Sequence, residues 1–96
     1  MNDNATIAKL RTLKPALAAE MKIRRMRVFG SVARGEETPD SDVDILVDFA
    51  ETPDLFQFAG YRREISERLG RRVDLVTPDA LHPLLKDDIL SEAIDV

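Results

Sequence analysis

The sequence contains no cysteine and only one histidine, His82. The absence of cysteine excludes disulfide bonds and thiolate zinc sites, and one imidazole is too few for a histidine-rich metal site. Carboxylates are then the only abundant side chains that bind metal ions, and they suit hard cations such as Mg²⁺. Any metal chemistry in this protein is therefore expected to use oxygen ligands.

The sequence also lacks an apolar run near the ~20 residues that a membrane-spanning helix requires. Its first residues are polar and do not resemble the apolar segment of a signal peptide. Lys and Arg number 14 against 18 Asp and Glu, which gives a net charge of −4, whereas nucleic-acid binders need a basic face. We therefore expect a soluble cytoplasmic protein with no membrane contact and no strong binding of nucleic acid.

The chain has 96 residues, which fits a single small domain over residues 1–96. A domain of this size buries only about 60–65 % of the surface that its unfolded chain exposes. It has little room for both a catalytic centre and a separate acceptor-binding domain. We therefore expect a second chain to complete any site, in a homo- or hetero-oligomer.

Three segments have the apolar spacing of helices. The first is capped by Asn4 or Thr6, and Pro15 predicts a break near Lys14, after which a second helical stretch begins. Its apolar positions are Ile7, Leu10, Leu13, Leu17 and Met21.

The next of the three helical segments starts after Thr52 or Asp54 and ends at Leu69, because Gly70 follows. Its expected apolar stripe consists of Leu55, Phe58, Ile65 and Leu69. The third begins at Pro83, and its expected buried face consists of Leu85, Ile89 and Ala93.

Alternating patterns predict three strands, over residues 25–29, 42–49 and 73–77. The second is apolar enough to lie in the centre of a sheet. The order of elements favours an α/β (α+β) fold, in which the simplest packing is a small mixed three-stranded sheet with helices on one face.

A Gly30-Ser31 pair follows the first strand and opens a predicted helical turn over residues 31–34. Glycine lets the backbone approach a phosphate closely, and the start of a helical turn presents free amides. The Ser31 hydroxyl can donate to a phosphate oxygen, and Arg34 lies one turn further on and adds a fixed positive charge. This turn therefore predicts an anion-binding site.

Carboxylates gather on the next two strands. Asp42 and Asp44 are two residues apart, so both point to the same side of their strand, and Asp74 lies in the third strand. Clustered like charges are costly unless a cation neutralises them. Three carboxylates on adjacent strands are what a two-metal phosphoryl-transfer site needs.

Residues 28–48, VFGSVARGEETPDSDVDILVD, contain Gly-Ser, ten further residues and then Asp-x-Asp. This motif resembles the signature of the DNA polymerase beta-like nucleotidyltransferase superfamily, in the form typical of its minimal nucleotidyltransferase branch. Residues 70–83, GRRVDLVTPDALHP, are similar to the strand with the third carboxylate in that branch. The resemblance covers nearly the whole chain and implies the nucleotidyltransferase fold.

The resemblance implies that Asp42 and Asp44 hold two Mg²⁺ ions that grip the triphosphate of ATP. It also implies that Asp74 joins the metal near the attacking oxygen. A hydroxyl would then attack the α-phosphorus and pyrophosphate would leave. The three aspartates are thus the expected catalytic and metal-binding residues.

The resemblance assigns the distal phosphates to Gly30 and Ser31. Arg34 and Ser41 belong to the same motif and are expected to bind nucleotide as well. For Ser41 an equal alternative is that it only caps the loop against the following strand.

Proteins of this branch pair with a HEPN-domain toxin, an RNA-cutting protein, and act as its antitoxin by adenylylating a tyrosine. The resemblance implies the same partner and reaction here. Two alternatives stay open: an antitoxin that neutralises its toxin by binding alone, and a nucleotidyltransferase that acts on a small molecule or an RNA end.

Other polar residues carry weaker expectations. Tyr61, Arg62 and Arg63 are expected on a solvated helix face, with contact to a partner or a nucleotide as the alternative, and His82 is expected to be structural. The expected role of the C-terminal acidic residues is to solvate the last helix; they are Asp87, Asp88, Glu92 and Asp95.

Overall fold

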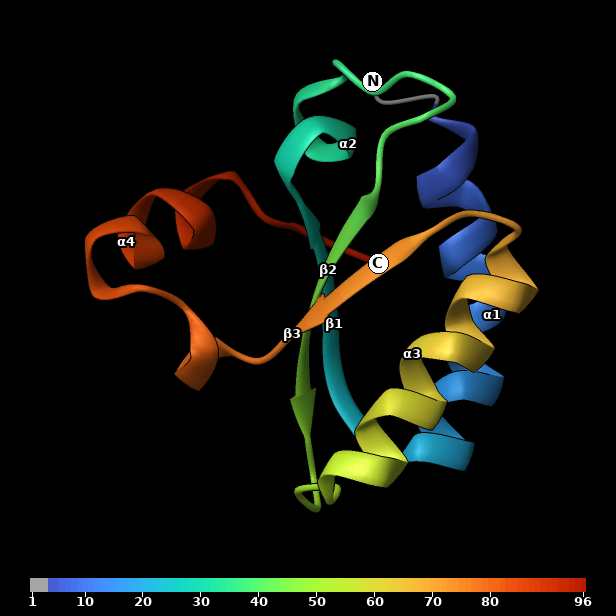
Figure 1. Ribbon diagram of the computed structural model, residues 1–96. Helices are drawn as coiled ribbons and strands as arrows, with labels where there is room; N and C mark the ends of the chain where they lie inside the picture. Colours follow the sequence, from blue (N-terminus) through green and yellow to red (C-terminus); the bar gives the residue numbers. More distant parts are fainter. Residues whose placement is uncertain (1–3) are drawn as a thin grey trace.

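The computed structural model describes residues 4–96, which form helices on both sides of a small sheet (Figure 1). The helices are α1 (Ala5–Met21), α2 (Gly30–Arg34), α3 (Leu55–Leu69) and α4 (Pro83–Glu92), and a 3₁₀ turn, η1 (Pro78–Ala80), precedes α4. The strands are β1 (Ile23–Phe29), β2 (Val43–Phe49), β3 (Val73–Val76) and β4 (Ile94–Asp95).

The sheet has the strand order β3-β2-β1-β4. β2 and β3 run parallel, and β1 is antiparallel to both of its neighbours. The predicted mixed sheet with a central second strand is therefore confirmed, but it has four strands rather than three. The fourth, β4, has two residues that pair with Arg27 and Val28 of β1, and two residues are too few for an alternating pattern to be recognised.

The predicted break near Lys14 is wrong, because α1 continues through Pro15. The Asn4 side chain caps α1 by accepting hydrogen bonds from the backbone amides of Thr6 and Ile7. Proline costs the helix one backbone hydrogen bond. Leu10 and Leu17, which lie on either side of Pro15, are both fully buried, and this burial holds the two halves of α1 on the same core.

Asp54, rather than Thr52, caps α3. Its carboxylate accepts from the Gln57 amide, and the Gln57 side chain accepts in return from the Asp54 amide, which forms a capping box. Gly70 ends the helix as predicted.

The apolar stripe of α3 is only partly buried. Ile65 and Leu69 belong to the core, whereas Leu55 is 86 % exposed, because it lies at the start of α3, at the end of the molecule (Figure 1). Tyr61, expected on a solvated face, instead packs against Phe49 with ring centroids 5.9 Å apart.

α1 and α3 cover one face of the sheet and enclose the hydrophobic core, while α4 lies on the other side of the strands, against α2 and β1 (Figure 1). The helices are thus not all on one face. The strand residues of the core are Ile23, Met26, Val28, Val43, Ile45, Val47, Val73 and Leu75. Leu46 faces away from this core and is also fully buried, which explains why β2 is apolar at consecutive positions.

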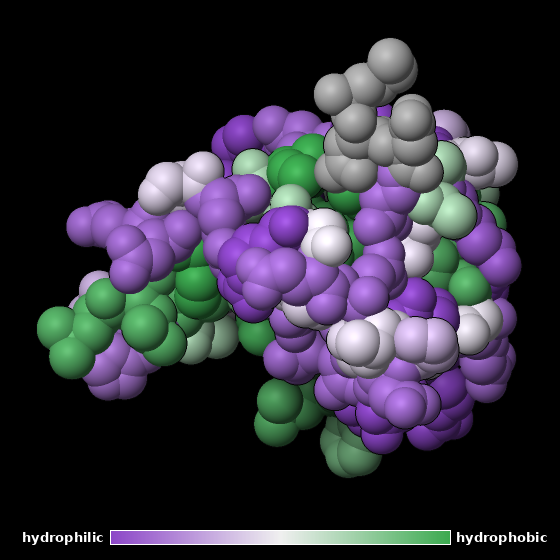
Figure 2. Space-filling view, turned by 90° about the horizontal axis from the view of Figure 1, so that it is seen from above, coloured by the Kyte–Doolittle hydropathy of each residue, from purple (hydrophilic) through white to green (hydrophobic). Residues whose placement is uncertain are grey.

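The predicted buried face of α4 is wrong at Leu85, whereas Ile89 and Ala93, the residue after the helix, are partly buried. No residue of α4 is fully buried, and Leu84 and Leu85 are 83 % and 54 % exposed. Figure 2 shows hydrophobic side chains at the projecting end of the molecule that α4 forms. His82 has the structural role expected of it, because its Nδ1 accepts a hydrogen bond from the Leu84 amide and caps α4.

Within residues 4–96, no helix combines the length and the hydrophobicity needed to cross a membrane.

Candidate active site

The strand pairing brings the motif residues to one edge of the sheet. Phe29, the last residue of β1, lies opposite Asp44 of β2, and Asp44 lies beside Asp74 of the parallel strand β3. In-register residues of a parallel pair point to the same face. The backbone therefore places two of the predicted carboxylates side by side, directly next to the Gly30 turn.

Gly30 approaches Asp44 more closely than any other residue type could. Its φ is +73°, and a Cβ atom added there would lie 2.1 Å from Asp44 Oδ2. Left-handed backbone is costly for residues other than glycine, and the missing side chain leaves room for the carboxylate. Gly30 is itself buried, so the turn and the acidic side chain form one packed unit.

The environment of Asp44 disfavours its negative charge. Partial burial, followed by the nearby charges of Asp74 and Asp42, raises the pKa of Asp44 above its usual range, and Arg34 opposes this only in part. A bound cation would relieve this repulsion. The oxygen ligands and the accumulated negative charge therefore fit Mg²⁺.

Asp42 does not complete a preformed metal cage. It precedes β2, and its carboxylate forms an ion pair with Arg72, with Oδ1 3.1 Å from Nε. Among residues 4–96 there is no group of three acidic or other ligating side chains already arranged around one point. Asp44 and Asp74 are adjacent as predicted, whereas Asp42 is half exposed and has one of its two carboxylate oxygens paired with Arg72.

The Gly30 turn presents donors of different kinds. Within the described chain the Ser31 hydroxyl has no hydrogen-bond partner, so it is available to a ligand. Arg34 forms ion pairs with Glu36 at 3.2 Å and with Glu92 at 3.1 Å.

Glu92 also accepts a hydrogen bond of 3.0 Å from the backbone amide of Gly30. The expectation that this residue only solvates the last helix is therefore wrong. It lies 62 residues from Gly30 along the chain, and only the packing of α4 against α2 brings the two together.

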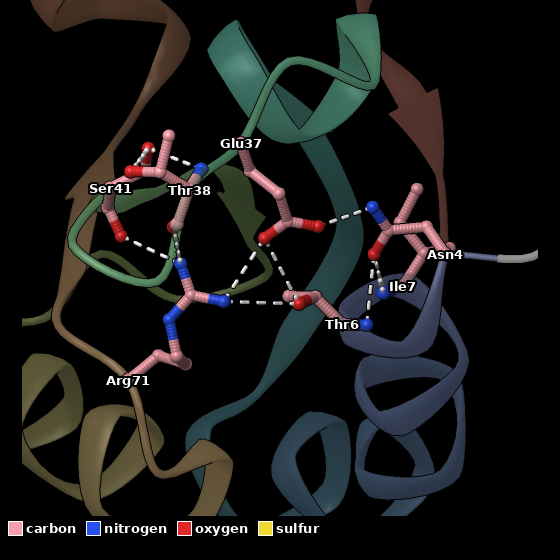
Figure 3. Close-up of polar contacts among 7 residues, drawn as sticks. All are labelled: Asn4, Thr6, Ile7, Glu37, Thr38, Ser41 and Arg71. Atoms are coloured by element: carbon pink, nitrogen blue, oxygen red, sulfur yellow. Dashed lines mark hydrogen bonds and ion pairs between the residues drawn. The ribbon is translucent and has the colours of Figure 1, made fainter.

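The loop between α2 and β2 is held by a polar cluster, shown in Figure 3. The Arg71 guanidinium donates to the Glu37 carboxylate at 3.0 Å and to the backbone oxygens of Thr38 and Ser41 at 3.2 and 2.8 Å. The Glu37 carboxylate also accepts from Asn4 and Thr6 at the start of α1. The cluster thus joins three distant segments and fixes the chain that leads into Asp42.

Ser41 belongs to this cluster. Its hydroxyl oxygen accepts a hydrogen bond of 2.9 Å from the Thr38 amide (Figure 3). This contact agrees with a capping role for Ser41 within the loop. Nucleotide binding by Ser41 stays a prediction.

Arg71→Ala is expected to lower the free energy of unfolding by about 1.5–3 kcal/mol, the usual contribution of hydrogen bonds to charged groups. Partial burial acts to raise the pKa of Glu37, but hydrogen bonds from Asn4, Arg71 and Thr6 outweigh it and hold that pKa below its usual range. The wild type should therefore have the benefit of the cluster above pH ~4.3, the usual pKa of glutamate, and lose it as the pH falls through the lower folded-state value.

Chemical denaturation at pH 7 and pH 3 measures both effects. Arg72→Ala is the matched control, since the Arg72 side chain is 77 % exposed and exposed ion pairs contribute at most about 1 kcal/mol. Equal losses in the two variants at pH 7 would contradict the structural role of the cluster.

Known proteins with similar sequences cover most of the chain. A protein from Methanocaldococcus jannaschii, named provisionally as a protein adenylyltransferase, is 47 % identical over 74 residues, which cover 77 % of this chain and 80 % of the relative. Protein adenylyltransferase MntA from Thermococcus cleftensis is 42 % identical over 83 residues, which cover 86 % of this chain and 84 % of the relative.

Solved structures have the same fold. One described provisionally as a minimal nucleotidyltransferase matches with a TM-score of 0.78 and 39 % identity, over 99 % of this chain and all of the other. A chain from the complex of a tri-AMPylated Shewanella oneidensis HEPN toxin with its MNT antitoxin matches with a TM-score of 0.68 over 94 % of this chain and 70 % of the other. The identity in that case is 20 %, so the likeness is one of fold.

The family model described as the nucleotidyltransferase domain matches residues 10–96. These residues include the Gly30 turn, the adjacent Asp44 and Asp74, and Glu92. By fold and by sequence, this chain belongs to the nucleotidyltransferase domain family.

Proposed function

We propose that this protein is a Mg²⁺-dependent adenylyltransferase that moves AMP from ATP to a tyrosine hydroxyl of a HEPN-domain toxin and thereby acts as its antitoxin. The observation that carries the proposal is the adjacency of Asp44 and Asp74 beside the buried Gly30 turn. This arrangement places cation ligands and phosphate donors on neighbouring strand ends, as transfer from a nucleoside triphosphate requires.

Each residue has a distinct task in this reaction. Gly30 and Ser31 bind the distal phosphates through a backbone amide and a free hydroxyl. When bound, Mg²⁺ would neutralise part of the triphosphate charge and lower the pKa of the attacking hydroxyl. Asp42 and Asp44 hold the metal, and Asp74 lies on the acceptor side, where it favours loss of the hydroxyl proton. The chain thus contributes positioning and charge, which supply most of the catalysis in such reactions.

The acceptor and the nucleotide are inferred from relatives. The relatives named as protein adenylyltransferases support AMP as the transferred group and a protein as the acceptor. The structural match to a HEPN toxin–antitoxin complex supports a HEPN-domain toxin as that protein.

Two labelled nucleotides test the reaction type. With a HEPN-domain toxin as candidate partner, label from α-³²P-ATP should become attached to the partner, whereas label from γ-³²P-ATP should not. Transfer of the γ label would mean phosphorylation and would contradict the proposal. RNA and small hydroxyl compounds serve as competing acceptors in the same assay, and labelling of either in place of the partner would assign the protein to a different acceptor class.

Mg-ATP is expected to stabilise the protein, because it binds the folded site and not the unfolded chain. At a hundredfold excess over the dissociation constant, linkage gives roughly 2.7 kcal/mol of added stability. Thermal unfolding with ATP and Mg²⁺ together, compared with either alone, measures this effect. The shift should need both components, since Asp44 and Asp74 repel a triphosphate that has no cation. An unchanged melting temperature at saturating Mg-ATP would contradict the proposed site.

A further inference from the structure

A carboxylate of α4 occupies two donors of the site: the Gly30 amide, which the proposed reaction assigns to phosphate, and Arg34, which the sequence motif predicts to bind nucleotide. Glu92 Oε1 accepts from the Gly30 amide at 3.0 Å, and Glu92 Oε2 lies 3.1 Å from Arg34 Nη1. A second, longer contact of 3.4 Å joins the same Nη1 to Oε1. The Glu92 side chain is only 28 % exposed, so the contact is an integral part of the packing of α4 against α2.

We propose that Glu92 stands in for a substrate phosphate in the nucleotide-free protein and is exchanged for that phosphate when Mg-ATP binds. The inference rests on the proposed function, because it takes the Gly30 amide as a phosphate donor and adds Arg34 as a second one. Glu92 thereby lowers the affinity for nucleotide, and it links the packing of α4 to whether the site holds a nucleotide.

The chemistry of the two occupants supports an exchange. A carboxylate and a phosphate are both oxygen anions that accept charge-assisted hydrogen bonds from guanidinium and amide groups. The Gly30 amide carries one hydrogen, so a phosphate oxygen cannot use it fully while Glu92 does.

Charge acts in the same direction as this competition. Glu92 lies near Asp44, and its negative charge contributes to the raised pKa of Asp44. A bound triphosphate would therefore both compete with Glu92 and repel it.

The exchange has a consequence for α4. Glu92 is the last residue of α4, and β4 follows within two residues. Loss of the Glu92 contacts removes hydrogen bonds that tie this C-terminal segment to α2. Nucleotide binding should therefore loosen α4, the helix that presents the exposed Leu84 and Leu85.

Isothermal titration of Mg-ATP into the full chain tests the proposal with matched variants. Glu92→Gln should bind Mg-ATP about three- to tenfold more tightly, because the competing state is weakened. Glu36→Gln is the control: Glu36 pairs with the same Arg34 at 3.2 Å, makes no contact with Gly30, and its loss should change affinity by at most about twofold. Glu92→Asp keeps the charge but shortens the side chain, so it should also bind more tightly if reach to both donors matters.

The possible outcomes separate this inference from the proposed function. Equal or weaker binding by Glu92→Gln, with normal binding by the wild type, would overturn the exchange and leave the proposed function intact. A wild type and variants that all fail to bind Mg-ATP would contradict both. Hydrogen exchange gives an independent readout: amides of α4 and β4 should exchange faster in the wild type with Mg-ATP than without it, and unchanged protection at saturation would also overturn the exchange.

Discussion

Asp44→Asn is expected to reduce nucleotide transfer by about 100-fold or more, the scale of losing one preorganised charge in an active site. Asparagine keeps the shape that fits against Gly30 but removes the negative charge that binds Mg²⁺. The same variant should be as stable as the wild type or more stable when no metal is present. The reason is that burial and the neighbouring aspartates raise the pKa of Asp44, so its ionised form costs stability at neutral pH.

Two measurements are needed, a transfer assay and thermal unfolding without and with Mg²⁺. Asp40→Asn is the control, since Asp40 is an exposed acid in the loop that precedes β2 and its loss should leave both quantities nearly unchanged. In the presence of Mg-ATP the order of stability should reverse, because only the wild type gains from binding. An Asp44→Asn protein that still transfers nucleotide at the wild-type rate would exclude the metal-binding role of this strand.

Gly30→Ala is expected to lose activity by about 100-fold, because small displacements of catalytic groups are that costly. The added Cβ would lie 2.1 Å from Asp44 Oδ2, so the carboxylate must move from the position that it has in this site. The positive φ of residue 30 adds a stability loss of roughly 1–2 kcal/mol.

Gly35→Ala separates the two effects of this substitution. Gly35 has nearly the same φ, +71°, but its added Cβ would meet nothing within 4 Å. It should therefore show a similar stability loss with activity close to that of the wild type. If the two variants lost activity equally, the close contact with Asp44 would not be the cause, and the functional importance of the Gly30 turn would have to be explained by backbone strain alone.

The positions of the paired aspartates could be predicted from the sequence because each depends on local patterns. β2 alternates around a central apolar run, and β3 repeats the pattern with Asp74 at the matching position. Gly30 directly follows a strand, and its neighbours form the predicted turn. Because β2 and β3 pair in parallel, these local patterns place Asp44 beside Asp74.

The contacts that could not be predicted join residues far apart in the chain. Glu92 accepts a hydrogen bond from Gly30, and Glu37 accepts one from Arg71. Neither contact follows from a periodic spacing or from a known sequence motif. The ion pair between Asp42 and Arg72 could not be predicted either, because no sequence motif links these two residues. Burial of α4 was overestimated for a related reason: apolar spacing shows which side of a helix is hydrophobic, but not whether another element covers that side.

The most direct test of the central claim is the intact mass of the candidate HEPN partner after incubation with this protein, ATP and Mg²⁺. The account predicts a mass increase of one or more AMP groups, which is lost with Asp44→Asn, without Mg²⁺, and when the modified tyrosine of the partner is replaced by phenylalanine. Cells that produce the partner should be protected in proportion to this modification. A partner that stays unmodified while the wild type and Asp44→Asn protect cells equally well would contradict the account, and protection would then come from binding alone.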